Sequence, residues 1–532
     1  MSLPKDLFHM PMIVIDYMFH NPVVDTMFNN VVVDAICHTG IKTYLKIRKP
    51  TKQAYKHQQT ILFHLIDQAR DTVFGRQYGF EDISSVKDFQ NNIPLATYKD
   101  FEPWIHYMLR GEKDITYPGK IPRFATSSGT TGDNKKYIPI TKESLKETHI
   151  KASTELLNRY YKNNPKTKLS SGKFIVIGGI MEKNPYTNKN NVGYMTAIFQ
   201  RNQPKITDLL RRPTNKITYL ADREQKIHKT VIQTSKENIT SITGQPSRCL
   251  DFFHRILKYT GKQNILEVRP NFEVFLRGGM SIDLYKSQYE KILPSSKVKY
   301  YQTYSASEGF FAVQSDNEDP NMYLLTDNGI FYEFIAMEEY GKPNPIVHTL
   351  NEVTLGKEYV LVITTNGGLR RYIIGDVIEF TSLNPRKIKI TGRTKYYIDV
   401  ASERTTVEHT DKALFEACKV TNAVATEYTV GPVMNVSDGK FGHERIIEFT
   451  RPPENIHHFL SVLDGELGKV NSAYYDERHI TKALAEPKIH VAAPGIFYTR
   501  LKSNNKMGGQ FKVPKLSNDR SVLDDLLKII DA

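Results

Sequence analysis

A run of hydroxyls, glycines and lysines between Thr126 and Lys136 offers the clearest chemistry in this chain. It reads Thr-Ser-Ser-Gly-Thr-Thr-Gly-Asp-Asn-Lys-Lys. Glycine lets the backbone approach a ligand closely, and successive N–H groups with neighbouring hydroxyls can bind an anion. Because the Walker A spacing is absent, a polar surface turn is an equally good interpretation of this run by itself. The candidate phosphate-binding residues are Ser127, Ser128, Gly129, Thr130, Thr131, Gly132 and Lys135.

Two acidic residues further along the chain follow apolar runs. Glu308 ends the sequence Tyr-Ser-Ala-Ser-Glu that begins at Tyr304, directly after a strand candidate. A carboxylate at the carboxyl end of a parallel strand lies where open α/β sheets bind ligands, and its oxygens suit Mg²⁺. Asp376 follows an apolar run and a glycine, where a carboxylate can accept both hydroxyls of a ribose. Ordinary turns are the alternative interpretation of both segments.

A glycine-rich loop near the C-terminus presents two further cations, Lys512 and Lys515. The segment from 507 to 515 reads Met-Gly-Gly-Gln-Phe-Lys-Val-Pro-Lys. A single lysine in a loop is usually solvated and carries no chemistry. The loop therefore gains meaning only in combination with the other three segments.

Taken together and in this order, the four segments resemble one family of enzymes. They are similar to the Gretchen Hagen (auxin-responsive) family of acyl-acid amido synthetases, bacterial type, within the acyl-adenylating superfamily. The first three segments resemble the nucleotide motifs of that family, and the fourth resembles its C-terminal lysine loop. The resemblance runs from about residue 55 to 525 and also includes Gly278-Gly279.

The resemblance implies a two-step ligase that uses ATP and Mg²⁺. A carboxylic acid is adenylated with release of pyrophosphate, and the acyl group then passes to an amine, expected to be an amino acid, with release of AMP. Lys512 and Glu308 are the expected catalytic residues, Glu308 also as the Mg²⁺ ligand, and Lys512 serves only the first step. Besides the phosphate loop, the resemblance implies nucleotide contacts from Gly278, Gly279, Tyr304, Ser307, Asp376 and Arg393. The acid pocket is expected near the helix at 142–161 and Gly178-Gly179.

Three positions depart from the family pattern. Ile373 stands where many members have Arg, and Arg248 stands where an aromatic residue is frequent. The run Ala401-Ser402-Glu403-Arg404 replaces a usual Gly-Glu pair. The last departure bears on how the C-terminal domain closes for the second step, and none removes a nucleotide residue.

The elements around these motifs predict an α/β fold. Strand candidates rich in β-branched and aromatic residues occur at 174–177, 274–276, 298–301 and 359–363, and helix candidates at 142–161 and 246–260 lie between them. This interleaving favours a largely parallel sheet. Residues 1–75 have a mainly helical pattern, followed by a turn at the glycines of 74–80. A basic stretch with Pro385 and Gly392 suggests two domains: a large nucleotide- and acyl-binding α/β domain at 1–385, and a smaller mobile α+β domain carrying the lysine loop at 386–532.

Composition narrows the class of protein but does not name it. The 532 residues carry a net charge of +14, spread through structured segments, with no zinc or helix-turn-helix signature for nucleic-acid binding. Three separated cysteines and a start without a signal sequence or a clean membrane span indicate a cytoplasmic protein that binds neither membrane nor nucleic acid. The oligomeric state is open. Two alternatives stay open as well: a thiol acceptor such as coenzyme A, and a nucleotide-binding protein without catalysis.

Overall fold

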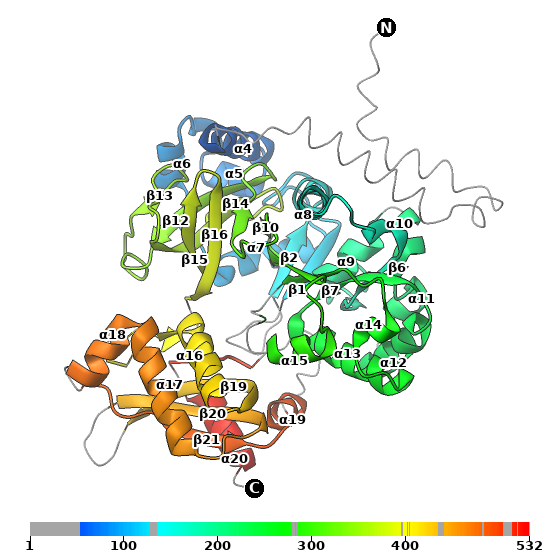
Figure 1. The fold of residues 1–532 in the computed structure, drawn as a ribbon. Coiled ribbons are helices and arrows are strands. Elements are labelled where there is room, and N and C mark those ends of the chain that lie inside the picture. The colour runs from blue at the N-terminus through cyan, green and yellow to red at the C-terminus, as the bar shows by residue number, and fades with distance from the viewer. Residues whose placement is uncertain are drawn as a thin grey trace, which may run out of the picture.

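A twelve-stranded sheet dominates the computed structural model. The structure describes residues 54–127, 136–203, 205–220, 222–278, 282, 286–394, 397–398, 400–401, 403, 405–434, 441–480, 483–503, 513–518 and 520–530. Among these residues, the large sheet has the order β13 (Val347–His348), β12 (Ile330–Ala336), β14 (Glu358–Thr365), β15 (Tyr372–Leu383), β16 (Arg386–Arg393), β11 (Met322–Leu324), β10 (Phe310–Gln314), β9 (Lys299–Ser305), β8 (Val274–Gly278), β7 (Ile239–Gly244), β3 (Lys173–Val176) and β6 (Arg211–Arg212). Figure 1 shows helices packed around this sheet.

The sheet has a parallel part and an antiparallel part. The strands from β6 to β9 pair in parallel, and helices connect β6, β7, β8 and β9 along the chain. From β9 to β13 every neighbouring pair is antiparallel. The prediction of a largely parallel sheet is therefore wrong for the second part, because strands joined by short turns pair as hairpins without a helical crossover. The four predicted strands all exist, as β3, β8, β9 and β14.

Helix α13 (Pro246–Thr260) has the predicted bounds and shows why the sequence specifies it. Pro246 lies in its first turn, where a missing N–H costs nothing, and Gly261 ends it with a φ of +69°. Phe252, Phe253 and Ile256 form its buried face. The predicted helix at 142–161 is a π-helix, Ser144–Ile150, that continues as α8 (Lys151–Asn163). The other helices in the stretch of chain that contains β6, β7, β8 and β9 are α9 (Met195–Arg201), α10 (Lys205–Leu210), α11 (Asn215–Thr218), α12 (Arg223–Thr234), α14 (Ile265–Val268) and α15 (Lys286–Ile292).

The N-terminal helices pack against the antiparallel part of the sheet. They are α4 (Ala54–Ala69), α5 (Val73–Gln77), α6 (Val86–Asn92) and α7 (Tyr98–Arg110). The predicted turn at 74–80 is only partly correct, because Gly75 lies inside α5 and only Gly79 adopts a turn conformation, with φ +60°. A Cβ on Gly75 would lie 2.1 Å from the carbonyl oxygen of Ala69. Glycine is thus required here for close packing. Across the described part of the chain, no helix combines the length and apolarity needed to cross a membrane.

A smaller four-stranded sheet contains the two strands that flank the predicted phosphate loop. Its order is β2 (Lys136–Ile140), β1 (Arg123–Ser127), β5 (Val192–Tyr194) and β4 (Met181–Glu182). Strands β1 and β2 are antiparallel and flank residues 128–135. Strand β5 runs parallel to β1 and sets Tyr194 opposite Thr126. The end of β5 therefore lies beside the start of the predicted phosphate loop.

The C-terminal part is an α+β unit with a sheet of its own, seen below the large sheet in Figure 1. Its three-stranded sheet contains β19 (Val424–Met434), β20 (Phe441–Arg451) and β21 (Lys488–Ala492), with helices α16 (Val407–Val420), α17 (Ile456–Val470), α18 (Ser472–Tyr475), α19 (Ile496–Ser503) and α20 (Ser521–Ile530). The short strands β17 (Tyr397–Ile398) and β18 (Thr405–Thr406) precede α16. The predicted division between 385 and 386 lies in the turn between β15 and β16, and β16 pairs with both β15 and β11. Strand pairing thus extends through Arg393, and we propose the domain boundary after that residue.

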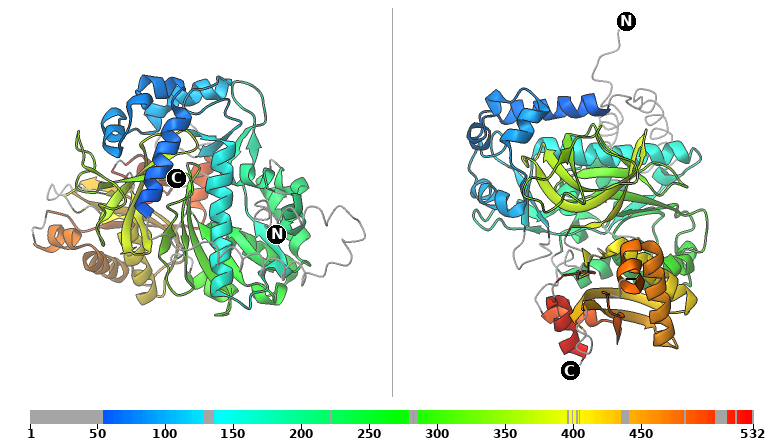
Figure 2. Two further views of the ribbon diagram at one scale, coloured as in Figure 1. Left: turned by 90° about the horizontal axis from the view of Figure 1, so that it is seen from above. Right: turned by 90° about the vertical axis from the view of Figure 1, so that its left-hand side faces the viewer.

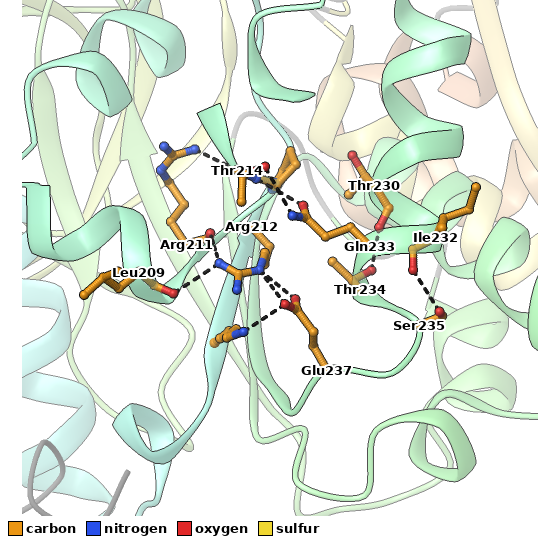
Figure 3. Close-up of polar contacts among 12 residues, drawn as sticks. Leu209, Arg211, Arg212, Thr214, Thr230, Ile232, Gln233, Thr234, Ser235 and Glu237 are labelled. Carbon is orange, nitrogen blue, oxygen red and sulfur yellow. Dashed lines mark hydrogen bonds and ion pairs between the residues drawn. The ribbon is translucent and has the colours of Figure 1, made fainter. Parts of the chain in front are cut away.

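Ion pairs fix the far edge of the large sheet, at strand β6. The guanidinium of Arg212 donates to both carboxylate oxygens of Glu237, at 2.8 and 2.7 Å, and to the carbonyl of Leu209 at 3.1 Å (Figure 3). Lys173 of β3 donates to the same carboxylate at 2.8 Å. Strands β3 and β6 are therefore joined by side chains as well as by their backbone pairing.

Candidate active site

A buried carboxylate, Asp376, lies at the centre of the candidate site. It belongs to β15 and faces Arg393 of β16 as a direct cross-strand pair. Its Oδ1 accepts from Nε of Arg393 at 2.7 Å, and its Oδ2 accepts from the hydroxyl of Tyr304 at 2.7 Å. Each carboxylate oxygen can accept two hydrogen bonds, so two acceptor positions remain. Those positions suit a pair of neighbouring hydroxyls.

The contact between Tyr304 and Asp376 requires the sheet to curve. Tyr304 belongs to β9, and β10, β11 and β16 separate β9 from β15 in the sheet order. In a flat sheet, four strand spacings would span about 19 Å. The hydrogen bond of 2.7 Å therefore brings the two ends of this segment together, and the curved strands are visible in the right-hand view of Figure 2. Curvature is what joins residues that are 72 positions apart in the chain.

Glu308 lies beside this cluster, just after β9. It is half-buried, and the hydroxyl of Tyr372 donates to its Oε1 at 3.3 Å. Burial raises the pKa of the Glu308 carboxyl above its ordinary value, while the positive charges of Lys136 and Arg393 oppose that rise. Burial also raises the pKa of Tyr372 well above the ordinary range, so this phenol stays a proton donor at neutral pH. A carboxylate flanked by cations and a fixed donor is thus available to a cationic or phosphate-bridging ligand.

The chain fits a Mg²⁺ ion that is shared with phosphate. Within the described residues, no group of three His, Cys, Asp or Glu side chains could hold a metal. Mg²⁺ does not need such a cage, because it usually takes one or two carboxylates together with substrate phosphates and water. Glu308 offers one such carboxylate beside the cluster of Asp376, Arg393 and Tyr304.

Lys136 and Tyr98 lie near Glu308, and Lys136 begins the strand that follows the predicted phosphate loop. The Nζ of Lys136 lies 5.2 Å from the ring centroid of Tyr98, and the hydroxyl of Tyr98 accepts from the backbone N–H of Tyr137 at 2.9 Å. Burial, with a smaller contribution from the charge of Glu308, raises the pKa of Tyr98 to about 12. The sequence prediction did not include Lys136, Tyr98 or Tyr372 as site residues. Lys136 and Tyr372 belong to recognised segments, whereas no sequence signal identified Tyr98.

A buried arginine, Arg371, positions the start of β15 and hence Tyr372 and Asp376. Arg371 has a positive φ of 42°, and its Nε donates to both oxygens of the fully buried Glu333 at 3.2 and 3.1 Å. Its Nη1 also donates to the carbonyls of Gln90 and Ile93 at the C-terminal end of α6, at 2.8 and 2.7 Å. The residue next to Tyr372 is thus fixed to both the sheet and an N-terminal helix. A positive φ outside glycine marks a conformation that the surroundings must hold in place.

Lys515, the second cation of the lysine loop, has a structural role. Its Nζ donates to both oxygens of Asp411, at 2.7 and 3.0 Å, and lies 4.8 Å from the ring centroid of Tyr428. Asp411 also accepts from the hydroxyl of Tyr428 at 2.6 Å. These contacts hold Lys515 in the C-terminal core, and the catalytic role of Lys512 stays a prediction. Lys512 itself lies outside the described residues.

The remaining predicted residues divide into two groups. Gly278 and Ser307 lie at the carboxyl ends of β8 and β9, at the same end of the parallel strands as Glu308. Ser127 ends β1. The residues outside the described part are Ser128, Gly129, Thr130, Thr131, Gly132, Lys135 and Gly279. Their roles stay predictions.

Glu403, in the run that departs from the family pattern, is fully buried. It accepts backbone N–H groups of Val400 and Ala401, at 3.1 and 2.7 Å, and a hydrogen bond joins it to Nε2 of His443 at 2.8 Å. Nη2 of Arg445 donates to Nδ1 of His443 at 3.2 Å, so Nε2 carries the hydrogen and donates it to Glu403. Glu403 thereby fixes the segment after β17 to the C-terminal sheet. The departure Ile373 packs partly buried beside Val360 and Val377.

Comparison with known proteins decides the family. Models of the N-terminal, central and C-terminal domains of the GH3 family match residues 43–298, 323–393 and 408–521. The chain belongs to the GH3 family. This confirms the family predicted from the four segments, since GH3 abbreviates the Gretchen Hagen name. The central model of this GH3 chain ends at Arg393, where β16 also ends.

Relatives of this GH3 chain are named as amido synthetases. Indole-3-acetic acid-amido synthetase GH3.3 of Arabidopsis thaliana is 22% identical, covering 89% of this chain and 91% of its own. Jasmonoyl--L-amino acid synthetase JAR4 of Nicotiana attenuata is 23% identical, covering 70% and 74%. Among solved structures, the GH3.15 acyl acid amido synthetase aligns with a TM-score of 0.75 at 19% identity, covering 92% and 96%. A 2-hydroxyisobutyryl-CoA ligase aligns with a TM-score of 0.56 at 12% identity, covering 94% and 92%. The predicted fold, a large α/β domain with a smaller C-terminal domain, is confirmed.

Proposed function

We propose that this GH3 protein is an ATP-dependent acyl-acid amido synthetase. In the first step, a carboxylate oxygen of the acid attacks the α-phosphorus of ATP, a P–O bond forms, and pyrophosphate leaves. In the second step, an amine attacks the acyl carbon, loses a proton, and displaces AMP. The observation that carries the proposal is the convergence of Tyr304, Glu308, Asp376 and Arg393 in a chain that belongs to the GH3 family.

Each residue of the cluster has a part in this proposal. Asp376 accepts the two ribose hydroxyls with the acceptor positions that Tyr304 and Arg393 leave open. Glu308 would hold Mg²⁺, which supplies electrostatic stabilisation to the phosphates. Lys136 adds positive charge near Glu308, where two anions must meet for the first step. Lys512 would stabilise the charge that builds on the α-phosphate. The domain after Arg393 would turn between the steps and carry Lys512 away.

The acceptor distinguishes this proposal from its nearest alternative. A coenzyme A ligase has the same fold, so the fold alone does not choose between an amine and a thiol. The names of the amido synthetase relatives support the amine, and an amino acid is the proposed acceptor.

The proposed location of the protein is the cytoplasm. The free thiols of Cys249 and Cys418 and the use of ATP support it.

One experiment tests the proposal at both steps. Purified protein is incubated with ATP, Mg²⁺ and a panel of carboxylic acids, and pyrophosphate release is measured. Acids that give a signal are then incubated with the twenty amino acids or with coenzyme A, and products are identified by mass spectrometry. Amide products support the proposal. Thioester products alone, or no acid-dependent pyrophosphate release, would overturn it.

A further inference from the structure

A half-buried lysine, Lys226, lies where the acid pocket of this enzyme is expected. It belongs to α12, and its Nζ donates to the carbonyl oxygens of Gly178 and Gly179 at 3.3 and 2.9 Å. These two glycines follow β3 at its carboxyl end, in a stretch whose residues from Val176 to Met181 are all half-buried. No carboxylate among the described residues pairs with Lys226. Within the described part of the chain, its positive charge is therefore met by carbonyl dipoles.

A second cation, Arg248, lies close enough for its charge to act on Lys226. Arg248 lies in the first turn of α13, at the position where the family often has an aromatic residue. Burial and, to a smaller extent, the charge of Arg248 lower the pKa of Lys226 to about 8. Both effects disfavour the charged ammonium form of Lys226. A bound anion would supply a negative partner and return the pKa toward its ordinary value.

An unpaired buried amide borders the same place. Gln200 of α9 is 4% exposed, and in the described part of the chain neither its Nε2 nor its Oε1 has a hydrogen-bond partner. Both atoms would lie 3.2 Å from a Cβ built on Gly178, so the amide points against the glycine pair. A buried amide without partners is unfavourable, and such groups often mark a site for a ligand. The Nε2 group provides a donor to an anion that Lys226 also binds.

Neighbouring side chains fix the backbone of Gly178 and Gly179, to which Lys226 donates. A Cβ on Gly179 would lie 1.7 Å from the ring of Tyr194, so a glycine is required there. The N–H of Gly179 donates to the hydroxyl of Thr196 at 3.0 Å, which orients the two carbonyls toward Lys226. The ammonium group is thus held by backbone atoms whose position is fixed by α9.

The surroundings of Lys226 lie at a known distance along the sheet from Glu308. Strands β3, β7, β8 and β9 are neighbours in the parallel part of the sheet. Three strand spacings therefore separate the carboxyl end of β3 from that of β9, about 14 Å along the sheet. Ligands of such sheets lie along the carboxyl ends of the strands. A group bound at Lys226 would be well removed from the carboxyl that reacts beside Glu308.

We propose that Lys226 and Gln200 form a subsite for a second, distal anionic group of the acid substrate. The substrate class is then an acid with two anionic ends, such as an extended dicarboxylate. The adenylated carboxyl lies at the end of β9, and the distal carboxylate lies at the end of β3. This inference rests on the proposed function for the reacting end, but the binding of the distal anion is independent of catalysis.

The test compares acids with one and two carboxylates on the same carbon chain. Affinities are measured by calorimetry without ATP, and turnover is measured by acid-dependent ATP–pyrophosphate exchange. Wild-type protein should favour some dicarboxylate over its monocarboxylate partner by about tenfold or more, as one charge-assisted hydrogen bond provides. Lys226→Met should remove this preference and leave the monocarboxylate and ATP constants unchanged. The control is Lys229→Met, an exposed lysine on the same helix, which should behave as wild type.

A second variant guards against a folding defect in Lys226→Met. Gln200→Glu places a carboxylate beside Lys226, so it should keep the fold, measured by melting temperature, while excluding the distal anion. A wild-type protein that favours no dicarboxylate in calorimetry would overturn the inference. It would also be overturned if Lys226→Met changed only the KM of ATP or only the KM of the amine acceptor, since the anion would then be a phosphate or the carboxylate of an amino acid. Dicarboxylate binding without any exchange would uphold the subsite and refute the proposed function.

Discussion

Replacing Asp376 with Asn tests the ribose role with a change of one atom. The amide keeps the size of the carboxylate and can still accept from the hydroxyl of Tyr304, but it loses the negative charge that pairs with Arg393. The side chain of Arg393 is 45% exposed, so water replaces much of that ion pair. The variant should therefore fold, with a modest loss of stability.

The effect on ATP follows from the two acceptor positions left on Asp376. A hydrogen bond to a charged group is worth about 1.5–3 kcal/mol, and one between neutral groups about 0.5–1.5 kcal/mol. Two ribose hydroxyls thus lose roughly 2–3 kcal/mol in total, which weakens ATP binding roughly 30- to 150-fold. The larger part of the loss should fall on the hydroxyl that faces the amide nitrogen, because that group cannot accept a hydrogen bond.

Calorimetry with ATP and with 2′-deoxy-ATP separates this role from a general defect. The two nucleotides and two proteins form a double-mutant cycle, in which a direct contact gives a coupling energy of about 1 kcal/mol or more. Asp411→Asn is a matched control, because Asp411 is also buried, accepts from a tyrosine hydroxyl and pairs with a lysine. That control should keep the wild-type ratio of the two affinities. If Asp376→Asn keeps the wild-type affinity for ATP, or the same ratio between the two nucleotides, the ribose assignment is wrong.

Three further outcomes are expected. Glu308→Gln should abolish most acid-dependent pyrophosphate release. Because burial raises the pKa of Glu308, ionisation opposes folding as pH rises, so the melting temperature of Glu308→Gln should exceed that of wild type at pH 7–8 and approach it near pH 4; equal melting curves throughout would contradict this. Lys512→Ala should block adenylation but still convert a presynthesised acyl-adenylate to the amide, whereas Lys515→Ala should lower the free energy of unfolding by about 1–3 kcal/mol. The assignment fails if Lys515→Ala alone blocks adenylation. Gly75→Ala should destabilise by about 1–3 kcal/mol in chemical denaturation, while Gly465→Ala, a helical position with open space around it, should be neutral or stabilising; similar losses in both would refute the packing argument.

The local patterns of the sequence were sufficient for most individual elements. Helix α13 could be bounded because Pro246 opens it, Gly261 follows it and its apolar residues recur at helical spacing. The strand candidates were found because β-branched and aromatic residues concentrate in them. Gly75 was misjudged because a glycine required by close packing and a glycine required by a turn have the same local sequence.

Properties that depend on distant parts of the chain were beyond the sequence. Asp376 and Tyr304 could each be assigned to a nucleotide, but their direct hydrogen bond depends on the curvature of the sheet. Tyr98 reaches the site from an N-terminal helix that carries no recognised motif. The antiparallel half of the sheet was missed because strand partners are set by tertiary packing, while the interleaved helices that suggested parallel pairing belong only to the other half.

The attachment of residues 514–517 to β19 limits how far Lys512 can travel. The carbonyl of Pro514 accepts from the hydroxyl of Thr429 at 2.7 Å, and Val430 exchanges backbone hydrogen bonds with Lys515 and Ser517 at 2.8 and 3.0 Å. Two residues of fully extended chain span about 7 Å, so the Cα of Lys512 stays within that radius of its anchor. A rearrangement of the loop alone is thus a short-range adjustment. Any longer displacement of Lys512 would require β19, and the sheet to which it belongs, to move with it.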